Sequence, residues 1–263
     1  MSELNYEPLI RDMTWSYSRL NSFEDCPHRW YLKYIKYPKA ERRKLFFASY
    51  GSFMHELLAD YYSVNKTADQ LRIAYLTKFR QNVSLPAPSY NVFQNYFNDG
   101  LEYIKTLDKP TGEILGVEQK IEFDLGDIRM TGFLDLYSKE EDKLIITDHK
   151  SRNLKPRSGR AKPTKGDQEL DSYLRQLYIY AGFLEKSTGK LPDELRFNTF
   201  RQQMVIKEPF QMEAYLSAQQ WVKDTVEAIC KESKFPPSIE FFKCKYLCEC
   251  QDLCDYYEIN FGR

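Results

Sequence analysis

Three strand-like segments in the middle of the chain, separated by only a few turn residues, constrain its fold more than any other feature. They span residues 113–124, 128–138 and 143–149, and each is rich in β-branched and aromatic residues with polar positions interleaved. Short turn signals connect them at 125–127 and 139–142. Strands joined this tightly run antiparallel, because a parallel neighbour requires a long crossover connection. The middle of the chain is therefore predicted to be a three-stranded antiparallel meander.

Helical periodicity flanks this meander on both sides. Apolar residues recur at spacings of three and four, and Pro27 interrupts the first helical segment. The predicted helices span 16–36, 48–63, 67–82, 91–107, 169–186 and 211–232. A loop at 151–167 and a short strand or hairpin at 194–208 complete the order. The succession of helices, meander, helix and strand predicts a mixed α/β fold.

The charge balance limits how the chain can bind nucleic acid. Its 263 residues include 38 Lys and Arg against 38 Asp and Glu, so binding must depend on local patches rather than on net charge. Residues 150–165 hold seven Lys and Arg and no acid, in a loop predicted to be flexible. A second basic run at 28–44, interleaved with aromatic residues, is expected to form another wall of a channel.

No stretch of the sequence suggests a membrane. The N-terminal residues carry charges where a signal peptide needs an apolar run, and no apolar run is long enough to cross a bilayer. We therefore expect a cytoplasmic protein with no membrane partner.

The sharpest local pattern is a pair of carboxylates beside a lysine. Asp148 and Lys150 end an apolar segment, and Asp135 stands in the segment before it. Residues i and i+2 of a strand share a face, and paired strands lie about 4.8 Å apart, so the three side chains should converge. Two carboxylates this close require a cation, and oxygen ligands suit Mg²⁺ or Mn²⁺. Taken alone, an Asp-x-Lys pattern is more often a surface ion pair.

Several short motifs, in this order, resemble the RecB-type branch of the PD-(D/E)XK nucleases. That branch includes nuclease domains of bacterial recombination enzymes, CRISPR-associated iron–sulfur exonucleases and many phage proteins. The opening SYSRLNSFEDCPHRW at 16–30 is similar to the usual start of the family, and the likeness runs from about residue 14 to 257. The remaining motifs are G-x-x-x-H at 51–55, G-x-x-D at 132–135, D-x-K at 148–150 and Q-L-x-x-Y at 176–180.

The resemblance implies roles for individual residues. Lys150 is the implied catalytic lysine, Gln176 and Tyr180 hold the substrate or the lysine, and Glu118 has a supporting role. One position departs from the family, because His149 stands where a Tyr or a hydrophobic residue is common. The implied metal ligands are the side chains of His55, Asp135 and Asp148 and the backbone carbonyl of His149.

The resemblance also implies an architecture and an activity. A restriction-endonuclease-like core at 112–209 follows an N-terminal helical region at 1–111 and precedes a C-terminal helix and iron–sulfur segment at 210–263, all in one integrated domain. The implied activity is metal-dependent DNA hydrolysis by an exonuclease that prefers single-stranded DNA, in recombination or repair, phage replication or CRISPR adaptation. A separate helicase, recombination or CRISPR protein is an expected partner.

A catalytically silent iron–sulfur module that binds DNA or a helicase is the alternative function. Silent relatives would be expected to lose Asp135, Asp148 or Lys150, and all three are present. A zinc protein without any nuclease role would leave the ordered motifs unexplained.

Six cysteines form the last pattern. Four of them crowd the tail as C-x3-C-x-C-x3-C, which in a reducing compartment indicates Zn²⁺ or an iron–sulfur cluster. Spacing alone favours zinc. Cys250 is an alternative ligand in the tail, and Cys230 is expected to be a small buried residue of a helix. The resemblance implies instead a 4Fe–4S cluster held by Cys26, Cys244, Cys248 and Cys254.

Overall fold

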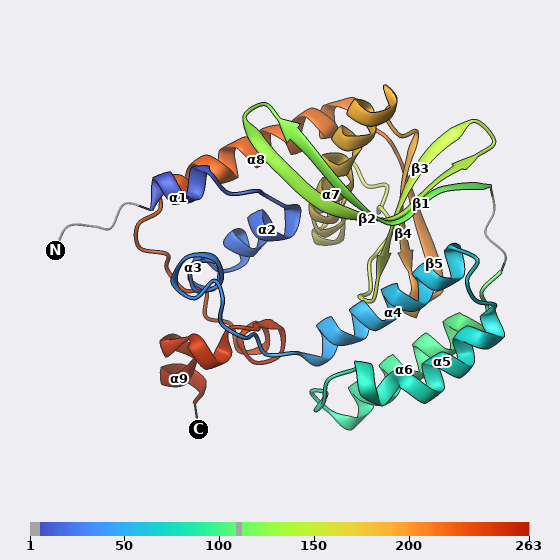
Figure 1. Cartoon of the computed structure of the whole chain (residues 1–263), viewed down its shortest axis with the longest axis horizontal. Helices are drawn as coiled ribbons and strands as arrows, with labels where there is room; N and C mark the ends of the chain where they lie inside the picture. Colours follow the sequence, from blue (N-terminus) through green and yellow to red (C-terminus); the bar gives the residue numbers. More distant parts are fainter. Residues whose placement is uncertain (1–5, 109–111, 263) are drawn as a thin grey trace.

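A five-stranded mixed sheet in the order β1-β2-β3-β4-β5 lies at the centre of the computed structural model, which describes residues 6–108 and 112–262 (Figure 1). The predicted meander is confirmed, since β1 pairs with β2 and β2 with β3, both antiparallel. The segment at 194–208 forms the hairpin β4–β5. The strands are β1 (Glu113–Leu125), β2 (Ile128–Glu140), β3 (Lys143–Lys150), β4 (Glu194–Thr199) and β5 (Met204–Pro209).

The sheet becomes mixed at the junction of β3 and β4. These two strands run parallel, and the chain passes between them through the long helix α7 (Lys165–Thr188). The helix begins four residues before the predicted start at 169. Thr164 caps it, because the Thr164 side chain accepts from the Asp167 backbone amide while Asp167 reaches back to the amide of Thr164. The cap therefore extends the helix beyond its apolar periodicity.

The helices fall into two groups with separate hydrophobic cores. One core lies between the sheet, the N-terminal helices, α7 and α8, and the other unites α4, α5 and α6 with Phe200 from the turn after β4. The predicted helices are confirmed, with the first divided at Cys26-Pro27. The short α1 was not predicted, because five residues are too few to show a periodicity. The remaining helices are α1 (Glu7–Arg11), α2 (Tyr17–Asp25), α3 (Pro27–Tyr31), η1 (Leu32–Lys36), α4 (Phe46–Tyr62), α5 (Ala68–Asn82), α6 (Tyr90–Lys105), α8 (Met212–Lys231) and α9 (Asp255–Phe261).

Strands β2 and β3 separate halfway along β2, which opens a fork in the sheet. The β2–β3 pairing runs from Glu140–Lys143 to Leu136–Thr147, whereas β1 stays paired with β2 as far as Ile128. The N-terminal segment docks on the freed side of β2. Trp15 donates its backbone N–H to the carbonyl of Arg129 over 2.8 Å, and its own carbonyl accepts from Thr131 over 2.7 Å.

The cysteine-rich tail lies beside α3, although the two are far apart in sequence (Figure 1). The His28 backbone N–H donates to the Pro236 carbonyl over 3.2 Å, and Lys33 pairs with Glu249 at 2.6 Å. In the tail, η3 (Lys243–Leu247) and η4 (Gln251–Leu253) precede α9. The two ends of the chain are thus joined by both backbone and side-chain contacts.

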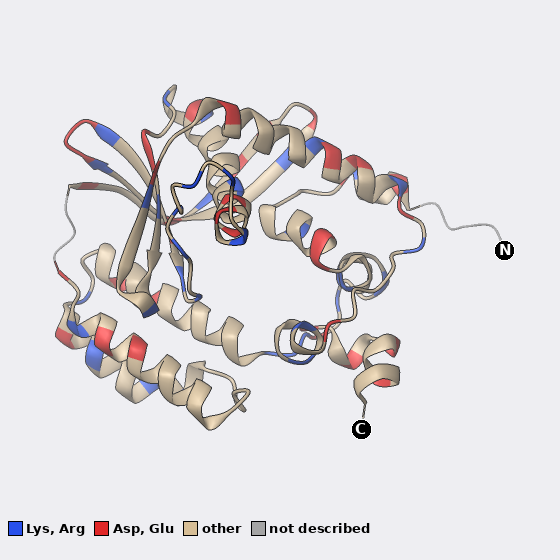
Figure 2. Ribbon diagram, turned by 180° about the vertical axis from the view of Figure 1, so that it is seen from behind, with Lys and Arg blue, Asp and Glu red and all other residues tan. Residues whose placement is uncertain are grey.

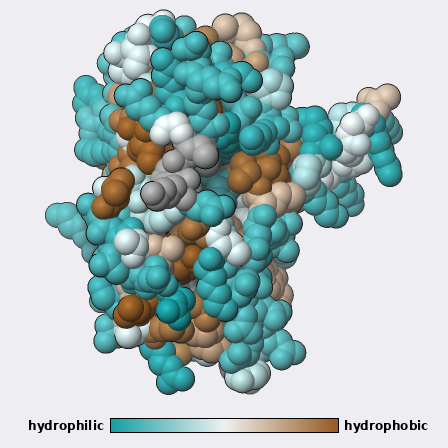
Figure 3. All heavy atoms as spheres, turned by 90° about the vertical axis from the view of Figure 1, so that its right-hand side faces the viewer, coloured by the Kyte–Doolittle hydropathy of each residue, from teal (hydrophilic) through white to brown (hydrophobic). Residues whose placement is uncertain are grey.

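The helices of the described residues are not long apolar segments. From the side of α5 and α6, the surface is mostly hydrophilic, with hydrophobic patches separated by polar side chains (Figure 3). Within 6–108 and 112–262, none of the helices has both the length and the apolar character needed to cross a membrane.

A matched pair of helical glycines tests the packing of the second core. A Cβ on Gly100 would lie 2.5 Å from the Tyr50 hydroxyl and 2.6 Å from the Tyr75 hydroxyl, both on fully buried rings. A Cβ on Gly51 would meet only the Ser151 hydroxyl, at 3.7 Å. We expect Gly100→Ala to lower the free energy of unfolding by about 1–3 kcal/mol through overpacking. Gly51→Ala should raise it by up to about 1 kcal/mol, because alanine favours helix.

Chemical denaturation followed by circular dichroism measures both changes. Equal effects of the two substitutions would contradict the tight packing around Gly100.

Candidate functional site

A cleft of about 1270 Å³ lies at the fork between β2 and β3. Side chains from α2, α4, the first three strands, α7 and the tail line its walls. Leu136 and Thr147 form the last β2–β3 pair, so the next residues at the fork are Asp135 and Asp148. Both are buried, with exposed fractions of 8% and 4%, yet both line the cleft. The divergence of the strands thus presents two carboxylates to one cavity.

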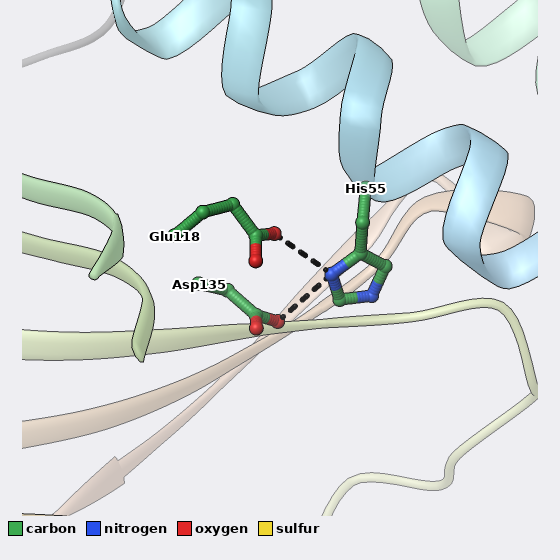
Figure 4. Close-up of side chains that lie close together, drawn as sticks. All are labelled: His55, Glu118 and Asp135. Atoms are coloured by element: carbon green, nitrogen blue, oxygen red, sulfur yellow. Dashed lines mark hydrogen bonds and ion pairs between the residues drawn. The ribbon is translucent and has the colours of Figure 1, made fainter. Parts of the chain in front are cut away.

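His55 from α4 meets two acidic side chains from the sheet (Figure 4). Its Nδ1 lies 3.1 Å from Oε1 of Glu118 and 3.5 Å from Oδ2 of Asp135. Its Nε2 donates to the backbone carbonyl of His149 over 2.9 Å. One imidazole therefore connects α4 with β1, β2 and β3.

The backbone of Glu118 has an unusual conformation. Its φ of 44° lies in the left-handed region, which is uncommon for residues other than glycine. The pairs Val117–Leu136 and Gln119–Leu134 place it opposite Asp135. Strained residues of this kind cluster at functional sites. Here the strained residue is the one that brings a second carboxylate to His55.

A second chain of contacts holds Lys150. Its Nζ lies 2.8 Å from Oδ2 of Asp148 and donates to the side-chain Oε1 of Gln176 over 3.1 Å. The Gln176 amide in turn lies 3.3 Å from the hydroxyl of Tyr180, one helical turn further along α7. Gly132 makes room for this ring, because a Cβ there would lie 2.7 Å from it. The D-x-K and Q-L-x-x-Y motifs therefore meet through the lysine.

The buried charges at the fork depend on one another. Burial and the nearby charge of Asp148 raise the pKa of Asp135. Burial alone would lower the pKa of His55, but the hydrogen bond to Glu118 and the charges of Asp135 and Asp148 raise it. His55 therefore favours its cationic form, in which both ring nitrogens donate. Apart from the ion pair with Lys150, the buried Oδ2 of Asp148 has no hydrogen-bond partner among the described residues.

The His149 side chain points away from the cleft. It stacks on Tyr62 with ring centroids 5.5 Å apart, and the Asn198 amide contacts its Nδ1 at 3.0 Å. Burial, together with the positive charges of His55 and Lys150, holds its pKa well below the ordinary range. The imidazole is thus neutral, and the His149 backbone contacts two residues of the site: the N–H donates to Asp135 over 2.7 Å and the carbonyl accepts from His55.

The comparisons with known proteins agree with this geometry. A family model described as the PD-(D/E)XK nuclease superfamily matches residues 14–255. The chain belongs to this superfamily. The resemblance stated from the motifs is therefore confirmed, together with the predicted mixed α/β core, its helical flanks and the cysteines near the C-terminus.

One solved structure shares the fold of this chain at low identity. The crystal structure of a "Putative exonuclease" from Eubacterium rectale is 16% identical, with a TM-score of 0.52, and the match covers 99% of this chain and 92% of that one. The structure of SSO0001 is 18% identical with a TM-score of 0.35, covering 97% and 88%. At such identity the first likeness shows the fold alone. The search of curated proteins found no match.

The residues assigned from the nuclease motifs line one cleft, but their side chains form two separate groups of contacts. His55, Glu118 and Asp135 place ligand atoms within 4.8 Å of one another, whereas Asp148 lies outside this group and contacts Lys150 instead. Glu118, given a supporting role from the sequence, contacts His55 more closely than Asp135 does. The left-handed backbone that directs the Glu118 side chain toward His55 could not be predicted from the sequence, since the residue is not a glycine.

The four cysteines assigned to the cluster line one small cavity. Cys250 is fully buried beside the cavity without lining it, and Cys230 is buried in α8 as predicted. The Cys26 sulfur lies 3.4 Å from the backbone N–H groups of Arg29 and Ser238, one on each end of the chain. The cavity therefore lies where the N-terminal helices meet the tail.

The basic loop before α7, whose Lys and Arg positions are blue in Figure 2, is anchored by hydrogen bonds rather than free. The buried carboxylate of Asp167 accepts four hydrogen bonds, from the backbone and hydroxyl groups of Ser158 and Thr164, at 2.6 to 2.7 Å. These bonds lower the pKa of Asp167. Arg152 pairs with Glu169, and Arg157 pairs with acids on α7 and β5. The loop expected to be flexible thus has two fixed points.

The second basic run, at 28–44, is not among the described residues that line the cleft. Lys33 and Arg43 contact the tail instead, through Glu249 and Gln251. These two charges hold the two ends of the chain together, and the second basic wall stays a prediction.

The anchoring of the loop can be tested by proteolysis. Asp167→Ala removes all four hydrogen bonds, so trypsin should cut after Arg157 and Arg160 several-fold faster than in the unmodified protein. Asp171→Ala is the matched control, because it removes one exposed ion pair of Arg157 and leaves that with Glu208. Mass spectrometry of the fragments identifies the sites. Equal cleavage rates for the two variants would contradict the anchoring.

Proposed function

We propose that this protein is a metal-dependent DNA nuclease whose reacting centre is the fork between β2 and β3. The observation that carries the proposal is the position of Lys150. It is held between Asp148 and Gln176 in the same cleft where His55, Glu118 and Asp135 converge. Membership of a nuclease superfamily supports hydrolysis of phosphodiester bonds, and the intact acid–lysine set supports an active enzyme over a silent module.

The donor groups at the fork suit a hard divalent cation. We assign the ion to the side chains of His55, Asp135 and Asp148 and to the His149 carbonyl, and we add Glu118 as a further ligand. Two buried carboxylates repel each other, and Asp148 carries a buried oxygen whose one partner among the described residues is Lys150. Oxygen-rich sites of this kind favour Mg²⁺ or Mn²⁺. Such an ion, when bound, supplies an activated water and neutralises developing phosphate charge.

The residues of the chain supply positioning and charge around that ion. The Lys150 ammonium has its direction fixed by two acceptors, so it can donate to a phosphate oxygen without a search over rotamers. Gln176 holds the lysine, and Tyr180 holds Gln176. The buried His149 imidazole fixes the strand behind the site, which places its carbonyl toward His55.

We infer that the substrate is DNA, with single strands preferred and cleavage starting at an end. Within the basic loop, Lys155, Arg160 and Lys162 make no ion pair with described residues and are available for phosphates. The cleft is bounded by helices on one side and by the tail on another, which favours threading of a strand. Recombination or repair, phage replication and CRISPR adaptation all use such an enzyme, with a helicase or another protein of the pathway as partner.

Substitutions at the fork should separate metal binding from turnover. Asp148→Ala should reduce cleavage of end-labelled single-stranded DNA in Mg²⁺ or Mn²⁺ by about 100-fold or more, with the fold retained. Lys150→Ala should reduce turnover similarly yet keep metal binding, measured by calorimetry, because the lysine acts on the transition state. Asp127→Asn, in the exposed β1–β2 turn, is the control. Substantial cleavage by pure Asp148→Ala protein would refute the assignment.

The same assay tests the dependence on strand ends. Linear single-stranded DNA should be degraded faster than duplex, and a closed circle of the same sequence should resist. Circles cleaved as fast as linear strands would exclude threading while leaving the metal centre intact.

We further propose that Cys26, Cys244, Cys248 and Cys254 hold a 4Fe–4S cluster. A tetrahedral zinc site with bonds of about 2.3 Å brings its sulfurs within about 4 Å of one another. Among the described residues, no three cysteine sulfurs lie within 4.8 Å of one another, although all four line one cavity. This spacing favours a larger group. Backbone N–H groups near the Cys26 sulfur also suit a cluster thiolate.

Two cysteine substitutions test the cluster. Protein purified without oxygen should be brown, with broad absorption near roughly 400 nm. Cys26→Ala should lose iron and colour and unfold at lower temperature, since it joins α3 to the tail. Cys230→Ala should keep both, because this thiol lies in α8 away from the cavity. Colourless protein with stoichiometric zinc after anaerobic reconstitution would contradict the proposal.

A further inference from the structure

Phe133 on β2 is exposed in a place where a strand residue is usually covered. Its exposed fraction is 54%, whereas that of the next residue, Leu134, is 1%. The ring lines the same cleft as Asp135, Asp148 and Lys150. A large apolar ring in contact with water costs free energy, so its position beside the reacting groups calls for a ligand.

The surrounding backbone keeps this ring in the cleft. Gly132 is covered by the ring of Tyr180 from α7, and Leu134 fills the core beside it, so Phe133 projects from the opposite side of the strand. The residue opposite Phe133 on β1 is Lys120, whose ammonium pairs with Glu122. More than half of the Phe133 side chain is exposed, so its face is available.

A second apolar surface lines the cleft from a different part of the chain. Phe242, near the start of η3, is 45% exposed, and its ring lies 6.1 Å from that of Phe47 on α4. Both also line the cleft. The cavity thus offers apolar rings from β2, α4 and the tail, and Lys150 lines the same cavity. A ligand that fits carries flat apolar faces together with negative charge.

We propose that Phe133 is a stacking platform for an unpaired base of the strand whose phosphate reaches Lys150. The proposal rests on the proposed nuclease function and specifies its substrate. Bases inside a duplex have both faces covered by neighbouring pairs, so a ring can stack only on an unpaired or terminal base. The ring therefore selects nucleic acid with unpaired bases at the cleft, independently of the sequence of those bases.

Binding measurements with and without bases test this role. The parent protein keeps Lys150, and EDTA removes divalent cations so that bound strands are not degraded. Fluorescence anisotropy gives Kd for a short oligothymidylate and for a strand of the same length made of abasic sites. Phe133→Ala should weaken binding of the oligothymidylate about tenfold. It should leave binding of the abasic strand unchanged, because no base is present to stack.

Two further variants separate stacking from a general loss of structure. Phe133→Trp retains a flat ring and should bind within about twofold of the parent. Val205→Ala removes a similarly exposed apolar side chain from β5, outside the cleft, and should change neither Kd. Circular dichroism verifies that all variants are folded.

The possible outcomes distinguish this inference from the nuclease proposal. Unchanged binding of oligothymidylate by Phe133→Ala, or equal losses for both strands, would overturn the stacking role. If the unmodified protein nevertheless cleaves DNA when Mg²⁺ is present, the nuclease proposal stands without it. A parent protein that binds neither strand, together with no cleavage by the unmodified protein, would overturn both.

Discussion

The end of hydrogen bonding between β2 and β3 is the constraint on which the rest of the molecule depends. Beyond the Leu136–Thr147 pair the strands separate, and their next residues are both aspartates. A continuous sheet would hold Asp135 and Asp148 side by side across one ladder, with no room for a substrate. Separation instead turns the carboxylates toward a cavity. The freed side of β2 then needs a backbone partner, which the Trp15 segment supplies.

The fork also brings together negative charges that the nearby cationic side chains do not fully neutralise. Two buried carboxylates are met by one lysine and by a histidine whose pKa their charges raise. In this arrangement the His55 imidazolium occupies the middle of an acidic group that a divalent ion would otherwise neutralise. A proton and a metal ion are therefore alternatives at the same position, since a ligating imidazole must be neutral.

The sequence predicted the parts of the structure that rest on local patterns. The meander followed from three strands joined by short turns, and α7 followed from its apolar face, although the cap at Thr164 was missed. Asp135, Asp148 and Lys150 were found because strand alternation and motif order both point to them. The contact of Glu118 with His55 was not predicted, because it depends on a left-handed backbone conformation that the sequence does not signal. Phe133 was not singled out, because an aromatic residue within a strand is normally expected in the core. Its exposure follows from the separation of β2 and β3, which the sequence does not show.

The junction of α3 with the tail has a consequence for the order of events during synthesis. Apart from its close neighbours in sequence, the residues that line the cavity with Cys26 lie more than 200 positions later, beginning at Pro237. While a ribosome is still making the nuclease core, α3 can pack on Trp15 but cannot complete its contacts with the C-terminal segment. Domains of nascent chains fold as their parts emerge, so this junction closes last. The junction can therefore be completed only after synthesis has passed the last cysteine. A chain cut short in α8 would leave the Cys26 thiol without its partners from the tail.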